Sequence, residues 1–365
     1  MPAENISMNY FSGKLINWYL QNKRDLPWRN TKDPYLIWLS EIILQQTKVE
    51  QGLSYYFAFA KEFPTVKSLA QAENNKIMKL WQGLGYYSRA RNLHATAKNI
   101  SENYYNLFPN TYNELLKLKG VGDYTAAAIA SFAFDKPHAT VDGNVYRVLS
   151  RIFGISTPID SNDGKKEFNQ LANELIDKKK SATHNQAIME FGAIQCKPIN
   201  PKCSICPFSE MCFALANNKI KELPFKAKKI LVRKRFFNYI VLNHHSCIII
   251  NKREEKDIWI NLYDFPLIET EKEIDEEEFL NSKNWKEFIL NKKYIIKSVS
   301  ITYKHILTHQ KIYARFWEIE CDKIFTKSLP KTCIKINRKD VFHYPVPKLI
   351  ENYLNSKGSK IINKK

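Results

Sequence analysis

The sequence contains no apolar run that approaches the ~20 residues needed to cross a bilayer. Its apolar stretches, such as residues 247–250, have the length of a strand. Residues 1–10 lack the basic segment followed by an apolar segment that marks a secretory signal. No internal repeat is present. These absences argue against a membrane-spanning or secreted protein, and we expect a cytoplasmic location.

Acidic residues are scarce, with 37 against 56 basic residues and a formal net charge of +19. Such an excess favours a polyanionic partner, nucleic acid first and an anionic membrane second. The 365 residues are 44% hydrophobic and 13% aromatic, which is typical of a folded globular protein. The length suggests two domains or one large domain.

The chain up to about residue 213 has the pattern of a helical domain. Phe11, Leu15 and Trp18 recur with the period of a helix. Proline-containing breakers divide the region into helices of ordinary length. We therefore predict an all-α domain over residues 1–213.

Residues 214–235 differ in composition. Between Lys219 and Arg235 there are eight basic residues and one acid, Glu222. We interpret this segment as a basic linker, which is either a solvated tether or a contact to a DNA backbone. The polar and basic residues 357–365 are expected to be disordered.

The pattern changes to strands after the linker, which predicts a small α+β domain over residues 236–356. The predicted strands cover residues 236–242, 246–251, 295–302 and 311–320, and helical patterns cover residues 276–290 and 346–354.

Four of the seven cysteines lie within seventeen residues, with the spacing C-x6-C-x2-C-x5-C. A cytosolic chain is not expected to carry disulfides, so clustered thiols indicate a metal. Four thiolates from one loop can enclose tetrahedral zinc or an iron–sulfur cubane. A zinc ribbon usually joins two C-x2-C knuckles and only one is present, so we favour iron–sulfur. The predicted ligands are Cys196, Cys203, Cys206 and Cys212.

Residues 115–129 read as an apolar helix, a tight Gly120-Val121-Gly122 turn and a second apolar helix. Glycines let the backbone approach a ligand closely, and the start of the second helix presents free N–H groups. Such a turn suits one phosphate of a DNA backbone, bound without regard to sequence. The segment resembles a helix-hairpin-helix motif.

Two carboxyl groups are candidates for catalysis. Asp142 precedes a predicted helix that begins near Asn144, and as an N-cap it stays ionised and can stabilise a developing cation. Glu41 lies in a helical run with Trp38 and Leu44 about one turn away. A semi-apolar helix face should raise the pKa of Glu41, as a general acid needs. The plain alternatives are a structural N-cap and a surface glutamate.

Together, the helix-hairpin-helix turn, the aspartate after it and the cysteine spacing resemble the endonuclease III superfamily of DNA glycosylases. The resemblance implies that the four cysteines hold a [4Fe-4S] cluster. In members that also cleave the DNA backbone, a lysine nucleophile follows the Gly-Val-Gly-x turn, but here that position is Tyr124. Without that amine no Schiff base can form there, so the resemblance implies a monofunctional glycosylase.

Four segments narrow the resemblance to MutY-type adenine DNA glycosylases, and the matches extend over roughly residues 10–215. The segments are residues 26–29, 39–47, 83–91 and 189–193. The resemblance implies that Glu41 protonates the flipped adenine and that Asp142 stabilises the oxocarbenium ion. It also implies that Tyr124 and Asn144 position the sugar and Asp142.

The same resemblance implies which residues bind the substrate. The adenine pocket would be lined by Trp28, Arg29, Leu44 and Glu190. Gln46 and Tyr86 would wedge into the duplex beside the lesion base, which offsets part of the cost of flipping the adenine out of the stack.

The strand region resembles the Nudix-like C-terminal domain of the same family, which contacts the base opposite the adenine. Residues 259–266 resemble its aromatic segment. No Nudix hydrolase box is present, so we do not expect nucleotide hydrolysis. The family's Phe-Ser-His reading loop aligns with Leu307-Thr308-His309, which keeps the hydroxyl and the imidazole but loses the aromatic ring. A plain hairpin turn is the alternative for Thr308 and His309.

We therefore expect an all-α helix-hairpin-helix glycosylase domain with an iron–sulfur loop, plus an α+β Nudix-like domain. The expected function is removal of adenine opposite 8-oxoguanine or guanine in double-stranded DNA, by a nucleoid-associated monomer with no membrane partner. One alternative is an endonuclease III-like pyrimidine-lesion glycosylase, against which Tyr124 argues. Another is a non-catalytic DNA-binding module, which would need neither Glu41 nor Asp142.

Overall fold

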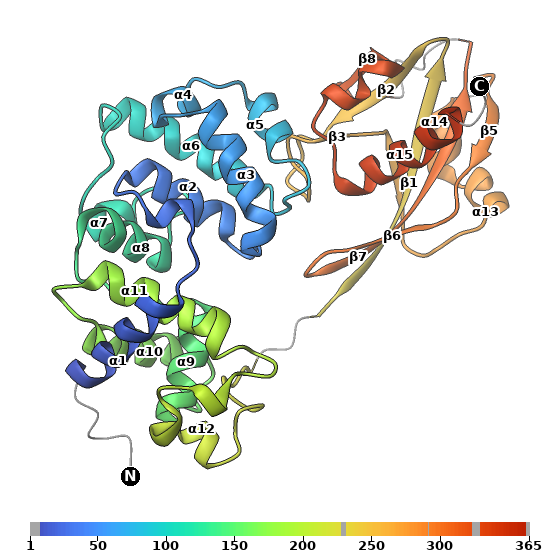
Figure 1. Ribbon diagram of the computed structural model, residues 1–365. Helices are drawn as coiled ribbons and strands as arrows, with labels where there is room; N and C mark the ends of the chain where they lie inside the picture. The colour runs from blue at the N-terminus through green and yellow to red at the C-terminus, as the bar shows by residue number, and fades with distance from the viewer. Residues whose placement is uncertain (1–7, 228–230, 291, 323–328, 363–365) are drawn as a thin grey trace. The chain divides into compact units, whose positions relative to one another are not determined.

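The computed structural model describes residues 8–227, 231–290, 292–322 and 329–362. The chain divides into two compact units (Figure 1). The helical unit contains Met1–Gln71 and Asn92–Lys229, and the sheet unit contains Ala72–Arg91 and Ile230–Lys365. The segment Ala72–Arg91, which the sequence pattern grouped with the helices, thus clusters with the strands. None of the described helices is long and apolar enough to span a membrane.

The first part of the chain is all helical, as predicted. A π-helical turn, Phe191–Gln195, continues α11, and α12 begins where the basic linker was expected. The helices are α1 (Met8–Asn22), α2 (Pro34–Leu44), α3 (Val49–Glu62), α4 (Val66–Ala70), α5 (Asn74–Leu80), α6 (Ser88–Asn103), α7 (Tyr112–Leu115), α8 (Asp123–Phe134), α9 (Gly143–Phe153), α10 (Asn162–Leu175), α11 (Ser181–Glu190) and α12 (Phe213–Ala216). Of these, α5 lies in the sheet unit and α6 begins there.

Two helix starts position the residues of interest. Pro34 occupies the first turn of α2, and the Asp33 carboxylate accepts the Tyr35 N–H at 2.8 Å. At α9 the Asp142 carboxylate accepts the N–H groups of Asn144 and Val145. Each cap satisfies backbone donors that have no partner within the helix, so the start of each helix is fixed.

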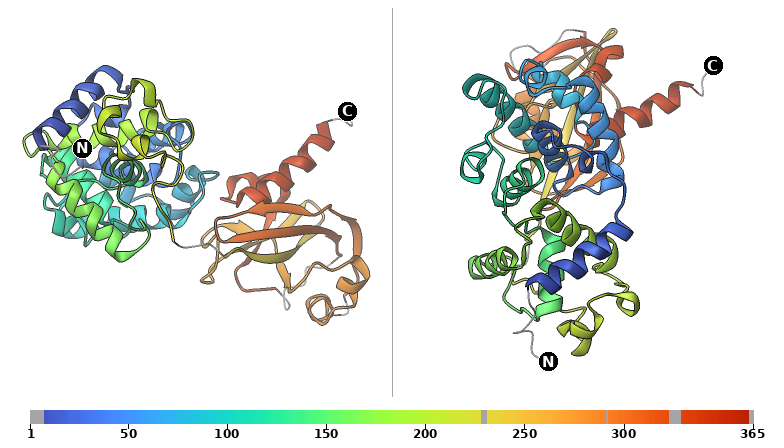
Figure 2. Two further views of the ribbon diagram at one scale, coloured as in Figure 1. Left: turned by 90° about the horizontal axis from the view of Figure 1, so that it is seen from below. Right: turned by 60° about the vertical axis from the view of Figure 1, so that its left-hand side comes forward.

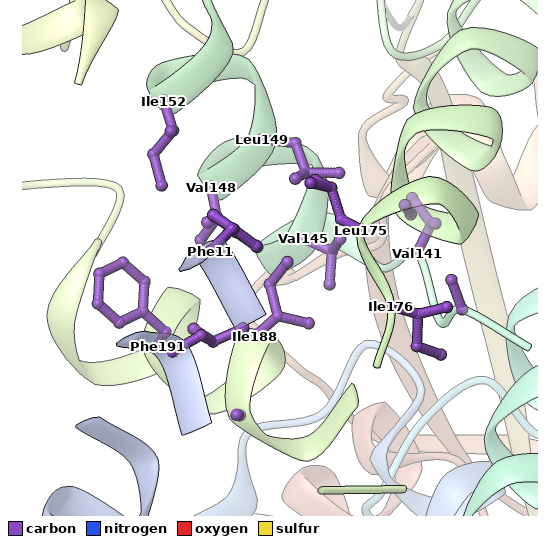
Figure 3. Close-up of a cluster of buried hydrophobic side chains, with 14 of the residues drawn as sticks. Phe11, Val141, Val145, Val148, Leu149, Ile152, Leu175, Ile176, Ile188 and Phe191 are labelled. Carbon is purple, nitrogen blue, oxygen red and sulfur yellow. The ribbon is translucent and has the colours of Figure 1, made fainter. Parts of the chain in front are cut away.

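One core cluster of the helical unit surrounds α9 (Figure 3). Val145, Val148 and Leu149 project from α9 into a cluster with Phe11 of α1 and Ile188 of α11, and all five are buried. Apolar residues at helical spacing thus bury one side of α9 and leave its N-terminus to face the site described below.

The sheet unit contains a mixed eight-stranded sheet. Its central order is β3-β2-β1-β7-β5, with β4 beside β1, β6 beside β7 and β8 beside β2. β1 and β7 are parallel, and the other pairs are antiparallel. The strands are β1 (Arg233–His244), β2 (Cys247–Lys252), β3 (Tyr263–Asp264), β4 (Leu267–Thr270), β5 (Ile295–Val299), β6 (Tyr303–Ile306), β7 (Gln310–Glu320) and β8 (Cys333–Asn337).

Helices pack on both faces of this sheet (Figure 2). On one face, Tyr353 of α15 (Lys348–Ile362) stacks on Phe316 with 3.9 Å between ring centroids. On the other face, Phe279 of α13 (Glu276–Asn281) stacks on Trp317 at 4.3 Å, and α14 (Lys283–Ile289) adds Trp285. Phe316 and Trp317 are neighbours on β7, so they point to opposite faces.

The longer strands were predictable and the short ones were not. Predicted strands 236–242, 246–251 and 311–320 correspond to β1, β2 and β7, whereas the strand predicted over 295–302 ends at Val299. The strands β3, β4, β6 and β8 have five residues or fewer. Strands this short contain too few alternating apolar and polar residues to be recognised from the sequence pattern.

The C-terminal helix is longer than expected. Helix α15 runs to Ile362, past residue 357, where the polar and basic tail was predicted to begin. Leu349, Ile350 and Tyr353 are buried and anchor α15. Once a helix is nucleated, each added residue gains a hydrogen bond at little further cost, so the helix continues past its packed part. Residues 363–365 lie outside the described residues.

Leu149 provides a test of the core around α9. We expect Leu149→Ala to lower the free energy of unfolding by ~2–5 kcal/mol, because a fully buried side chain leaves a cavity. Urea denaturation followed by circular dichroism measures the change. Leu107→Ala is the matched control, since Leu107 is 72% exposed. Equal destabilisation by the two substitutions would contradict the assignment of this core.

Candidate active site

A cavity of about 180 Å³ opens in the helical unit beside the start of α9. Side chains from α2, α8, α9, α11 and the turn Pro27–Arg29 line it. The sequence-predicted residues that the structure brings together here are Trp28, Arg29, Glu41, Leu44, Tyr124, Asp142, Asn144 and Glu190.

Glu41 lies on the inner face of α2 and is 6% exposed. The Tyr124 hydroxyl, from the first turn of α8, donates a hydrogen bond to Glu41 Oε2 at 2.7 Å. Burial raises the pKa of Glu41 to about 7, although the Tyr124 hydrogen bond opposes the rise. The nearby Asp142 carboxylate raises it further. Glu41 can therefore carry a proton near neutral pH, as predicted for a general acid.

Asp142 is held in a different environment. Its Oδ1 accepts the backbone N–H groups of Asn144 and Val145, and its Oδ2 accepts the Asn144 side-chain amide at 2.8 Å. Burial raises the pKa of Asp142, but these three hydrogen bonds and the positive charge of Arg147 oppose the rise. Three donors aimed at one carboxylate favour its ionised form.

Glu190 sits at the end of α11 and pairs with two arginines. Arg24 Nε donates to Glu190 Oε1 at 2.7 Å, and Arg29 Nη2 donates to Oε2 at 2.7 Å. Burial alone would raise the pKa of Glu190, but the hydrogen bonds from Arg24 and Arg29 lower it to about 2. This carboxylate stays ionised, so it can accept hydrogen bonds from a ligand but cannot donate a proton.

Several residues that line the cavity were not among the predicted site residues, and they include Arg24, Gln186 and Met189. Arg24 stands two residues before Leu26 in a segment already recognised, so its position beside the motif was the available signal. Gln186 lies one turn before Glu190 on α11, and its Oε1 accepts the Tyr19 hydroxyl at 2.8 Å. Met189 places its sulfur 3.8 Å from the Tyr124 hydroxyl.

The structure shows why the recognised segment 189–193 contains a glycine, Gly192. A Cβ atom at Gly192 would lie 2.5 Å from the Cβ of Asn144. A larger residue would therefore push against the side chain that donates to Asp142.

The Gly120-Val121-Gly122 turn joins α7 to α8, as the helix-hairpin-helix prediction requires. Gly120 has φ 79°, a left-handed conformation that favours glycine. No side chain caps the N-terminus of α8, so its first N–H groups remain available to a phosphate.

The four clustered thiols lie around the short helical turns that follow α11. The backbone N–H of Phe208 points at the sulfur of Cys206, and those of Ala214 and Leu215 point at Cys212. Arg151 Nη1 lies 3.5 Å from Cys196 Sγ. N–H donors and a guanidinium directed at sulfur suit thiolate ligands of an iron–sulfur cluster.

The described residues contain no group of three His, Cys, Asp or Glu side chains close enough to hold a single metal ion. The fit to a cluster therefore rests on the donor set. It consists of four cysteines whose charges act on one another: those of Cys196, Cys203 and Cys212 all raise the pKa of the Cys206 thiol.

The two predicted wedge residues are exposed and lie outside the cavity. Gln46 and Tyr86 have φ 55° and 47°, so both adopt the left-handed conformation that is uncommon for residues with a Cβ. Tyr86 is 45% exposed. An exposed side chain on a constrained backbone is suited to contact a ligand outside the pocket.

The predicted reading loop connects β6 to β7 as a hairpin, and Thr308 and His309 are both exposed. Within the sheet unit, the Thr308 hydroxyl shares a hydrogen bond with the Tyr86 hydroxyl. A cavity of about 680 Å³ beside them is lined by Trp259, His305 and Arg91 as well. The loop is therefore a hairpin turn, and its polar side chains line a cavity.

Comparison with known protein families agrees with this geometry. Residues 39–178 match the HhH-GPD superfamily of base excision DNA repair proteins. Residues 196–212 match the iron–sulfur binding domain of endonuclease III, and residues 238–356 match the NUDIX domain. These matches confirm the predicted helix-hairpin-helix region, the iron–sulfur loop and the Nudix-like domain.

Among solved structures, a thermostable thymine-DNA glycosylase is similar, with a TM-score of 0.54 and 32% identity over 57% of this chain and 97% of that one. Endonuclease III in a non-covalent DNA complex shares the fold, with a TM-score of 0.50 and 20% identity over 59% of this chain and 99% of that one.

The sequence relatives are more specific. The adenine DNA glycosylase of Buchnera aphidicola subsp. Baizongia pistaciae is 34% identical over 347 residues, which cover 92% of this chain and 94% of the relative. The human adenine DNA glycosylase is 42% identical over 213 residues, which cover 56% of this chain and 39% of that protein. Since the Buchnera match covers both chains nearly in full, this chain belongs to the adenine DNA glycosylase family.

Proposed function

We propose that this chain hydrolyses the N-glycosidic bond of an adenine that lies opposite 8-oxoguanine or guanine in duplex DNA. The observation that carries the proposal is the pair of carboxyl groups in one cavity. Glu41 is buried and has a pKa of about 7, whereas Asp142 accepts three hydrogen bonds that favour its ionised form. A carboxyl group that can donate a proton and a second one held by hydrogen bonds serve hydrolysis through an oxocarbenium-like transition state.

The proposed reaction begins when adenine leaves the base stack and enters the cavity. Glu41 donates its proton to the imidazole-ring nitrogen of adenine, and the electron pair of the breaking bond moves onto the base. Asp142 stabilises the resulting oxocarbenium ion, by charge or by a transient bond to the sugar, and Asn144 holds Asp142 in place. Water then completes the hydrolysis, and the DNA strand remains intact.

The cavity also supports a glycosylase without lyase activity. Among the described residues that line it there are two arginines, Arg24 and Arg29, and no lysine. The position at which lyases carry their nucleophile is Tyr124, whose hydroxyl is engaged by Glu41. A Schiff base needs an amine with an accessible lone pair, which a guanidinium does not supply.

The paired charges around Glu190 suit the Watson–Crick edge of adenine. That edge offers an amino donor and a ring-nitrogen acceptor, and the site offers a fixed carboxylate acceptor beside two guanidinium donors. We infer that Trp28 and Leu44 supply the apolar surfaces between which the base lies.

We assign recognition of the opposite base to the β6–β7 loop, because the adenine itself is undamaged and cannot report the mispair. Thr308 and His309 offer a hydroxyl and an imidazole at the cavity of the sheet unit. We propose that the chain acts as a monomer. We place this action in the cytoplasm at the nucleoid.

Cys196, Cys203, Cys206 and Cys212 would hold a [4Fe-4S] cluster, which would stabilise their loop without taking part in bond cleavage, since four cysteine ligands close such a site.

The direct test of the function is release of adenine from duplexes with adenine opposite 8-oxoguanine, guanine or thymine. We expect single-turnover release for the first two, and strand breaks only after added alkali. Glu41→Gln should slow release by ~10²–10⁴-fold because it cannot donate the proton, while duplex binding persists. Glu102→Gln, at an exposed position of α6, is the control. Near-normal release by Glu41→Gln, or strand breaks without alkali, would sink the proposed mechanism.

The pH dependence of release should report on Glu41. Because the acid form is active, the single-turnover rate should fall as pH rises above about 7. Tyr124→Phe removes a hydrogen bond that lowers the pKa of Glu41, so this limb should move to higher pH. Tyr105→Phe, at an 84% exposed position, should leave the profile unchanged. A limb that moves to lower pH in Tyr124→Phe would refute this assignment.

The reading loop can be tested by substituting both polar residues at once. Thr308→Ala with His309→Ala should reduce the preference for 8-oxoguanine over guanine by roughly 5- to 150-fold, the effect of losing ~1–3 kcal/mol of hydrogen bonding. His245→Ala with Ser246→Ala, in the exposed turn between β1 and β2, is the matched control. If the loop variant keeps the full preference in competition assays, recognition lies elsewhere.

A further inference from the structure

One end of the sheet has a face that none of the described helices of the sheet unit covers. The register places Lys234 beside Lys311 and Phe236 beside Tyr313 across the parallel pair β1 and β7. β6 extends the same rows, with Ile306 beside Lys311 and Lys304 beside Tyr313. Residues that pair directly across strands point to the same side of a sheet. We call these six residues the open face: Lys234, Phe236, Lys304, Ile306, Lys311 and Tyr313.

The helices on this side of the sheet stop short of the open face. Phe279 of α13 and Trp285 of α14 pack on Ile240, Trp317 and Ile319, which lie farther along β1 and β7. Figure 1 shows the β6–β7 hairpin extending away from α13 and α14. The open face therefore begins where the packed core of this side ends.

The side chains of the open face are mainly aromatic and basic. Phe236 and Tyr313 stack with 5.4 Å between ring centroids and 18° between ring planes. Lys234 and Lys304 are exposed and Lys311 is half-buried, and no described residue forms a hydrogen bond or ion pair with the side chain of any of the three. Ile306 is 64% exposed.

The border of the face adds one more unpaired donor. A shallow depression beside the aromatic pair is lined by Thr302, Glu273 and Arg315. The Thr302 hydroxyl donates to Glu273 at 3.1 Å, so this acid is already engaged. The buried Nε of Arg315 has no partner among the described residues.

We propose that the open face binds the phosphodiester backbone of DNA next to the nucleotide that the β6–β7 loop contacts. Three lysines without acidic partners complement a row of phosphates, which are spaced by a few ångströms along a strand. A stacked aromatic pair on a sheet offers a flat apolar surface for sugars or an unstacked base. Thr308 and His309 follow Ile306 after one residue, Leu307, so Lys304 and Lys311 flank the loop on the same hairpin. Lys234 lies beside Lys311 on β1.

An acidic protein surface is the competing occupant, since lysines alone would suit either partner. The stacked rings favour DNA, because sugars and bases can stack on a flat aromatic surface. An acidic peptide has no group that would bind there. The inference rests on the proposed function only in taking DNA as the ligand, and it does not depend on which base is removed.

The test measures binding of the full-length holoprotein to an undamaged duplex over a series of salt concentrations. The triple variant Lys234→Ala, Lys304→Ala and Lys311→Ala should weaken binding at low salt by at least ~10-fold. It should also reduce the slope of log affinity against log salt by about 2–3, at ~0.9 for each phosphate that a lysine no longer neutralises. The matched control is Lys283→Ala, Lys286→Ala and Lys292→Ala, at exposed positions of the same unit. The control should retain most of the affinity and slope.

A second variant tests the aromatic pair without changing charge. Tyr313→Leu should weaken binding several-fold and leave the salt slope unchanged. Equal losses in the two lysine triples, or an unchanged slope in the open-face triple, would overturn the proposal. If the open-face triple variant lost binding to polyglutamate but kept its binding to the duplex, the face would be assigned to an acidic protein. That result would overturn the proposal as well. If wild-type protein binds the duplex but releases no adenine, the proposed function fails while this inference stands.

Discussion

Helix α9 is the element on which the helical unit depends, because three different constraints meet on it. Its N-terminus holds the Asp142 carboxylate, and its apolar side packs into one of the buried clusters of the unit. Its buried arginines bind the cysteine loop. Arg147 donates to the Cys196 carbonyl at 2.7 Å, and Arg151 donates to the Lys197 carbonyl at 2.8 Å. A displacement of α9 would disturb the carboxylate, the core and the loop together.

The same helix shows why a buried carboxyl pair can exist here. Burying Glu41 and Asp142 disfavours their charged forms, and an unpaired buried charge costs several kcal/mol. Three hydrogen bonds offset this cost at Asp142, while burial raises the pKa of Glu41 to about 7 and so favours its neutral form. At Glu190 the cost is offset by hydrogen bonds from its two arginines, which lower the pKa of the carboxyl group. One small cavity thus contains three carboxyl groups in three electrostatic situations.

Much of this could be predicted from local sequence. An aspartate before a helix start is an N-cap by its own geometry, as Asp142 is, and an apolar helix face predicts burial, as at Glu41. Arg24 and Gln186 could not be found in this way, since their roles come from contacts across 166 and 167 residues, with Glu190 and Tyr19. The short strands and the assignment of Ala72–Arg91 to the sheet unit also depend on distant partners, which periodicity does not register.

The parallel pairing of β1 with β7 has a consequence for how the protein is made. Arg235 and Gln310 are 75 residues apart in sequence and are joined by a hydrogen bond in the finished sheet. The central pair of the sheet can therefore form only after nearly the whole second half of the chain has left the ribosome. The helical unit also contains distant contacts, such as α1 with α11, but both of those helices precede β1 in the chain. Since domains fold in the order of synthesis, we expect the helices around Glu41 to be in place while β1 still lacks its partner strand.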